Sequence, residues 1–142
     1  MTLSAIAGIG SAIVGGFYVA FAFTVMPALR RRPVSEAGAA MVSINERAVR
    51  LPFMVLFFGT ALACAGTVAR QVLNPVEDSA TSILGAACYL TGWLLTMTVN
   101  VPLNNRLARS NLGWAEFEKS WNRANLTRAV LSVAGGALLI LN

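Results

Sequence analysis

The chain has 142 residues, of which 56% are hydrophobic and only 12% are charged. This apolar share is far above that of a soluble globular protein, so the composition predicts an integral membrane protein with one domain over residues 1–142. The net charge of +5 does not indicate nucleic-acid binding, because the basic residues flank apolar runs instead of lining one face of a soluble fold.

Apolar runs recur along the chain. Residues 1–29, 51–69 and 79–105 each reach the roughly 18 residues that indicate a spanning helix, whereas a fourth run, residues 129–142, is shorter. We predict spans at approximately residues 3–29, 51–70, 79–104 and 122–141. The predicted fold is all-α: an antiparallel four-helix transmembrane bundle with short amphipathic interfacial helices on the cytoplasmic side.

The basic residues predict the orientation of this bundle. Except for Arg70, the eleven lysines and arginines lie between runs one and two or between runs three and four. Because Lys and Arg are enriched in cytoplasmic loops, both of these connections are predicted to be cytoplasmic. Both termini then face outward, and the protein is expected in a lipid bilayer, that of a bacterial inner (plasma) membrane.

The first run combines small and aromatic residues. Gly8, Ala12 and Gly16 are four residues apart, a spacing that lets helices approach closely. We interpret them as packing within the monomer, with packing in a homo-oligomer as the alternative. Phe17 and Phe21 continue the helix on a neighbouring face. They are either core residues or the wall of a flat aromatic pocket, and we include them as substrate-binding candidates.

A helix is predicted from Ser35 to Arg50, before the second run. Met41, Asn45 and Ala48 share one side of it. Asn45 therefore either joins a central polar cluster or is a solvated amide on a surface helix.

The second and third runs contain two cysteines and a tryptophan whose environments can be predicted. Cys64 and Cys88 lack a partner at CxxC spacing. We interpret both as small buried hydrophobic residues, with a bridge between the two runs as the alternative. Trp93 lies near the middle of the third run, and an indole N–H buried at that depth is expected to have a partner.

Amides interrupt the apolar sequence at the end of the third run. Asn100 and Asn104 are four residues apart, so they share one face of a helix. Pro102 lies between them, lacks a backbone N–H, and clashes with the carbonyl four residues earlier. We therefore expect a loosened helix near Thr98.

Trp114, Phe117 and Trp121 predict an amphipathic helix at the inner interface, and Asn125 and Arg128 continue the same stripe into the fourth run. That run covers roughly 21 Å of a hydrocarbon core about 30 Å thick. Arg128 is therefore predicted to lie inside the membrane and face the bundle interior, which makes it a functional-site candidate. The alternatives are snorkelling to the headgroups, a thinner bilayer, or residues missing at the C-terminus.

The absence of histidine restricts the chemistry further. Protein-ligated iron, copper and zinc draw on imidazole, thiolate and carboxylate ligands. The chain has no histidine, and its two cysteines are far apart. We expect no metal site.

Four segments resemble the anthrone oxygenase family of small membrane proteins, and the likeness covers nearly the whole chain. They are Val-Met-Pro-Ala-Leu after the first aromatic span, the segment from Met41 to Asn45, Asn-Val-Pro-Leu-Asn after the third run, and Trp-Asn-x-x-Asn-x-x-Arg before the fourth. By resemblance, the polar positions of the family fall on Asn45, Asn100, Asn104, Trp121, Asn125 and Arg128.

The resemblance implies an enzyme that oxidises an anthrone to an anthraquinone with molecular oxygen and without a recognised cofactor. The expected substrate is a small, flat, apolar aromatic molecule with an acidic C–H group. Once this group loses its proton, the delocalised anion can pass an electron to oxygen directly. The protein then need only bind the ring and stabilise the oxyanion. Arg128 would hold the phenolate-type charge and Trp121 would stack on the ring. Asn100 and Asn104 would donate to oxygen, while Asn45, Asn125, Phe17 and Phe21 would bind the substrate.

No proton-abstracting base stands out. Glu46 and Glu116 are candidates by proximity to the inner interface, or else they are solvated surface charges. Two other functions compete with the oxygenase. A small-solute or drug transporter of this size depends on an intramembrane carboxylate, and none of the four runs contains one. In a noncatalytic scaffold subunit, Arg128 and the amides would only join helices.

Overall fold

The computed structural model describes residues 2–77 and 79–141, and within them the chain is helical with short connections. In chain order, the elements are α1 (Leu3–Ala20), the π-helix η1 (Phe21–Val25), α2 (Met26–Leu29), α3 (Val34–Ala48), α4 (Leu51–Leu73), α5 (Ser79–Leu95), the π-helix η2 (Thr96–Asn100), α6 (Val101–Ala108) and α7 (Trp114–Ile140). The all-α prediction is therefore confirmed.

Three helical segments in the described part of the chain are long and apolar enough to cross a membrane: Leu3–Leu29, Leu51–Leu73 and Ser79–Ala108. They coincide with the first three predicted spans. The fourth predicted span is not among these three segments; it lies in α7, one continuous helix that joins the expected interfacial helix to the fourth run. Neither glycine nor proline interrupts the sequence between Trp114 and Ala134, so nothing breaks the helix there.

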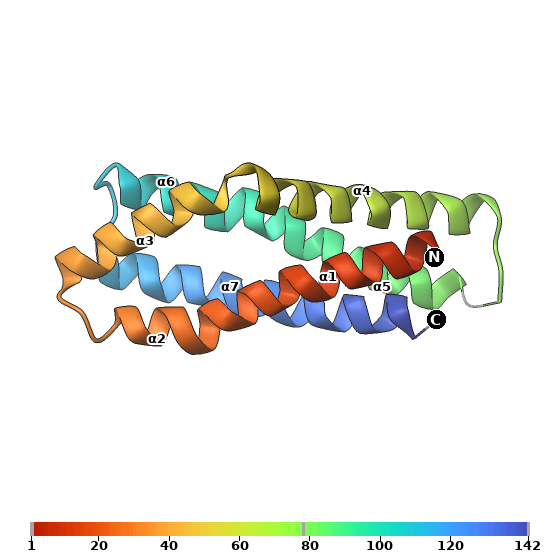
Figure 1. Ribbon diagram of the computed structural model, residues 1–142, viewed down its shortest axis with the longest axis horizontal. Coiled ribbons are helices and arrows are strands. Elements are labelled where there is room, and N and C mark those ends of the chain that lie inside the picture. Colours follow the sequence, from red (N-terminus) through yellow and green to blue (C-terminus); the bar gives the residue numbers. More distant parts are fainter. Residues whose placement is uncertain (1, 78, 142) are drawn as a thin grey trace.

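The four longest helices, α1, α4, α5 and α7, lie side by side along the longest axis of the molecule (Figure 1). Helix α1 packs against α7 and α4, and α5 packs against α7 and α4. Both termini lie at one end, together with the connection between α4 and α5 (Figure 1). Helices α2, α3 and α6 and the first turns of α7 lie at the other end, and that end carries most of the basic residues.

Glycines bring α7 close to both of its neighbours. A Cβ atom on Gly136 would lie 3.0 Å from the carbonyl oxygen of Gly8 and 3.0 Å from the backbone nitrogen of Ala12. One on Gly135 would lie 2.6 Å from the carbonyl oxygen of Gly85. Packing of Gly8 and Ala12 within the monomer is thus confirmed. The prediction fails for Gly16, whose Cβ position faces open space.

Gly135→Ala is therefore expected to destabilise the fold. The new methyl group would meet a backbone oxygen that cannot move without shifting α5, and such overpacking costs about 1–3 kcal/mol. Gly59→Ala is the matched control, since its Cβ position in α4 also faces open space and alanine is the better helix former. Thermal unfolding in detergent should show a lower midpoint for Gly135→Ala alone. Equal midpoints for the two variants would contradict this account of the α5–α7 contact.

A proline lies two residues after the end of each π-helix. Pro27 follows η1 and Pro102 follows η2, each within the first two residues of the next α-helix. Because proline removes one N–H and clashes with the carbonyl four residues back, the helix widens locally. The N–H of Val101 accordingly bonds the oxygen of Thr96, five residues earlier. The predicted loosening near Thr98 is confirmed, and it also occurs in the first span.

One expectation in the third span is wrong. The indole nitrogen of Trp93 is buried and has no hydrogen-bond partner among the described residues. Its ring packs against Phe57, with centroids 6.1 Å apart, and against Phe58 at 5.9 Å. This apolar surrounding supplies dispersion and ring contacts instead of an acceptor.

Candidate functional site

Arg128 lies inside the protein, with 5% of its surface exposed. Its Nε and Nη2 atoms donate to Oδ1 of Asn125 at 3.2 and 3.0 Å. Its Nη1 atom donates to Oγ1 of Thr96 at 3.1 Å. The guanidinium carbon is 4.0 Å from the centre of the Tyr18 ring and 5.1 Å from that of Trp121, both within cation–π range.

No carboxylate lies within ion-pair distance of Arg128 in the part of the chain that the structure describes. A guanidinium has five N–H groups, and the bonds to Asn125 and Thr96 use three of them. The Tyr18 hydroxyl interacts with the guanidinium as well, but none of these neighbours carries the negative charge that would balance the cation. A buried cation without a counter-ion is costly, which makes an anionic ligand its natural complement.

The partners of Arg128 are themselves held by three helices. The Nδ2 atom of Asn125 donates to the backbone oxygen of Tyr18 at 3.0 Å, which joins α7 to α1. The hydroxyl of Thr96 donates to the carbonyl of Gly92 at 3.0 Å and lies 3.4 Å from the hydroxyl of Tyr18. Segments that are far apart in the sequence but adjacent in space therefore fix the position of the guanidinium.

A second polar group fixes Trp121. Its indole N–H donates to Oδ1 of Asn104 at 2.8 Å, and its backbone oxygen accepts from Nδ2 of Asn100 at 3.4 Å. Its ring also packs on Phe21, with centroids 5.4 Å apart. The side-chain oxygen of Asn100 is buried and has no partner among the described residues. The two amides predicted on one helix face thus both reach Trp121.

A cavity of about 220 Å³ lies beside this cluster. It exceeds the roughly 150 Å³ of an engineered cavity that binds benzene and is smaller than the roughly 300 Å³ at which drug-sized sites begin. Its polar wall comes from four side chains, Asn45, Thr96, Asn104 and Arg128, and its aromatic wall from Phe17, Tyr18, Phe21, Phe53, Phe57, Phe58 and Trp121. Such a cavity suits a flat apolar ligand with one charged oxygen.

The structure brings most of the predicted site residues to this cavity. Its lining includes six of them: Asn45, Asn104, Trp121, Arg128, Phe17 and Phe21. Asn100 and Asn125 do not line it, because their amide groups turn toward backbone carbonyls. Nδ2 of Asn45 is buried and has no partner in the described chain, so Asn45 is not the solvated surface amide of the alternative interpretation.

Tyr18 and Thr96 belong to the site and were not predicted. Thr96 lies four residues before Asn100 and eight before Asn104, so helical spacing placed it near their face. Tyr18 lies beside Phe17, one of the predicted aromatic residues. The sequence offered no sign that its ring would contact a cation on α7.

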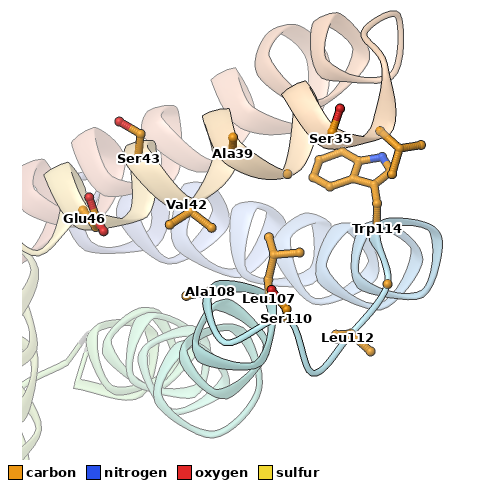
Figure 2. Close-up of a pocket in the computed structure, with 13 residues that line it drawn as sticks. Ser35, Ala39, Val42, Ser43, Glu46, Leu107, Ala108, Ser110, Leu112 and Trp114 are labelled. Carbon is orange, nitrogen blue, oxygen red and sulfur yellow. The ribbon is translucent and has the colours of Figure 1, made fainter.

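Neither acidic candidate reaches the cavity. Glu46 and Glu116 are both exposed. Glu46 borders a separate groove of about 560 Å³ between α3 and the connection from α6 to α7. Figure 2 shows Val42 and Leu107 on opposite walls of that groove, with Glu46 toward one end. Proximity to the inner interface therefore did not identify a base in contact with the site.

The side chains of the described chain that could bind a metal ion, or form a disulfide, do not come together. Within residues 2–77 and 79–141, no group of three His, Cys, Asp or Glu side chains is placed to hold a metal ion. Cys64 and Cys88 are both free, so the alternative of a bridge between the second and third runs is wrong.

The fold is that of a helical membrane-type protein, because three of its helical segments are long and apolar enough to cross a membrane. It contains an aromatic cavity with a buried cation in its wall. The sequence profile of the family described as anthrone oxygenase matches residues 47–138, more than half of the chain. The chain belongs to the anthrone oxygenase family. The matched segment contains Asn100, Asn104, Trp121, Asn125 and Arg128. No curated protein and no solved structure matches the chain.

Proposed function

We propose that the protein is a membrane oxygenase of the anthrone oxygenase type. It oxidises a flat, apolar substrate with an acidic C–H group, using molecular oxygen and no cofactor. The observation that carries the proposal is Arg128: a buried guanidinium without a carboxylate partner in the described chain, in the wall of an aromatic cavity. Family membership supports the same reaction class.

The chemistry follows from the charge that develops on the substrate. Loss of the C–H proton leaves a delocalised anion whose negative charge collects on the ring-ketone oxygen. The guanidinium of Arg128, in the wall of the cavity, donates to that oxyanion in a site of low dielectric, where such donors have their largest effect. The anion then transfers electrons to oxygen. A methylene group and O₂ become a carbonyl group and water, so atoms and electrons balance.

The neighbouring side chains take distinct roles in this proposal. Trp121 stacks on the substrate ring, and Asn104 holds the Trp121 indole in place. Asn45 offers an unpaired N–H to a second oxygen of the substrate or to O₂. Asn100 and Asn125 act as positioning residues, because their amides are committed to the backbone of Trp121 and Tyr18.

We also propose the finer topology: an antiparallel four-helix transmembrane bundle in a bacterial inner membrane, with α7 as the fourth span and both termini outside. The basic residues support it, because most of them lie at the end opposite the termini. A periplasmic reporter fused after residue 142 should be active, and one inserted between Arg109 and Gly113 should not. The reverse result would invert the orientation and place the cavity near the outer face.

Oxygen uptake tests the reaction itself. Purified protein in detergent or nanodiscs should consume oxygen when an anthrone is added, in proportion to protein concentration and above the rate of spontaneous oxidation. A transporter or a noncatalytic scaffold would leave that rate unchanged. Uptake equal to the protein-free rate for a series of anthrones would contradict the proposed function, although not the fold.

A further inference from the structure

A groove of about 590 Å³ runs along the end of the first span, apart from the aromatic cavity. Its lining consists of Phe23, Thr24, Pro27, Ala28, Arg31 and Arg32. Phe23 and Thr24 lie in η1, Pro27 and Ala28 lie in α2, and Arg31 and Arg32 lie just beyond the end of α2.

The groove changes in polarity along its length. Phe23 belongs to η1, inside a segment apolar enough to cross a membrane, and 71% of its surface is exposed. Arg31 and Arg32 follow the last turn of α2 and are exposed. The small side chain of Ala28 and the short ring of Pro27 leave space between these two ends. An apolar end at membrane depth therefore leads to a cationic end at the interface.

The two arginines are free to bind a ligand. Arg30 donates to the carboxylate of Glu118, whereas no carboxylate in the described chain lies within ion-pair distance of Arg31 or Arg32. Nor are their side chains needed to cap α2, because the backbone N–H groups of Arg31 and Arg32 already bond the carbonyls of Ala28 and Leu29. Guanidinium groups are well suited to bind phosphate, and these two, from consecutive residues without a carboxylate partner, line the same end of the groove.

We propose that this groove binds one anionic phospholipid. Arg31 and Arg32 hold the phosphate and the negatively charged headgroup, and an acyl chain lies against Phe23 and Ala28. Both ends of the groove are needed to identify this ligand. A free phosphate has no apolar part to contact Phe23, and a zwitterionic lipid has no net negative charge to pair with the second arginine. The site does not touch the Arg128 cavity and does not depend on the proposed reaction.

Native mass spectrometry of the protein released from nanodiscs tests this site. With a mixture of phosphatidylglycerol and phosphatidylcholine, we expect one retained phosphatidylglycerol per chain. Arg31→Gln with Arg32→Gln should weaken retention about 30-fold, since each cation near an anionic lipid contributes about a 5-fold effect. Arg47→Gln with Arg50→Gln is the matched control: it removes the same charge from exposed arginines outside the groove and should have little effect.

Phe23→Ser separates a lipid from a free anion. It should weaken phosphatidylglycerol retention while leaving the affinity for glycerol phosphate, the soluble headgroup fragment, unchanged. Unfolding midpoints in lipid-free detergent confirm that each variant is folded. If the Arg31/Arg32 and Arg47/Arg50 double variants lost phosphatidylglycerol retention equally, the attraction would be a diffuse one between basic residues and charged membranes, and the proposed site would be wrong. Unchanged retention in Phe23→Ser, or displacement of the lipid by millimolar phosphate, would also overturn it.

Discussion

Arg128→Lys should reduce turnover on the order of 10²-fold or more while the protein stays folded. The guanidinium uses three N–H groups on Asn125 and Thr96 and still lines the cavity. A lysine ammonium has only three donors on a flexible stem, so it cannot make the same internal bonds and still present a fork to an oxyanion. The measurement is oxygen consumption with an anthrone, beside the unfolding midpoint of each variant.

Arg123→Lys is the matched control for this experiment. Arg123 lies on the same helix but is exposed, and its replacement should change neither activity nor stability. Arg128→Gln should lose activity as well, because it removes the charge. If Arg128 only joined helices, stability and activity would fall together in both variants. A well-folded Arg128→Lys protein with normal turnover would contradict the catalytic role.

Asn125→Leu is expected to cost about 3 kcal/mol of stability and to abolish most activity. The side chain is fully buried, and it accepts two bonds from Arg128 while donating to the backbone oxygen of Tyr18. Leucine fills a similar volume but removes two of the three hydrogen bonds of the buried guanidinium and the side-chain bond to the Tyr18 carbonyl, and hydrogen bonds to charged groups are among the costliest to lose. Thermal unfolding and oxygen uptake measure the two effects.

Asn125→Asp separates the structural contribution from the electrostatic one. The aspartate keeps an acceptor for Arg128, so it should be more stable than the leucine variant. Its carboxylate also pairs with the guanidinium and competes with the anion of the substrate, so activity should still fall at least tenfold. Asn105→Leu, at an exposed position in α6, is the control. Full activity in Asn125→Asp would mean that the charge of Arg128 is not used.

Hydropathy and helical spacing were enough to predict the spans and one stripe of the site. The three apolar runs had to be helices of about bilayer length, because no other open structure satisfies the backbone inside lipid. The stripe of Trp121, Asn125 and Arg128 followed from residues three and four apart on a single helix. Pro102 marked the widened turn because its missing N–H acts locally.

Hydropathy and helical spacing could not predict contacts between segments that are distant in the sequence. Whether an amide points to a ligand or to a backbone carbonyl depends on the helix across from it, and this is why Asn100 and Asn125 do not line the cavity. Tyr18 joined the site only because α1 packs on α7. The sequence by itself determined which segments are long and apolar enough to span and which residues share a face, and it favoured a buried Arg128 over snorkelling to the headgroups. Only the tertiary structure decided what each buried group touches, because those partners lie up to 121 residues apart and no local periodicity encodes them.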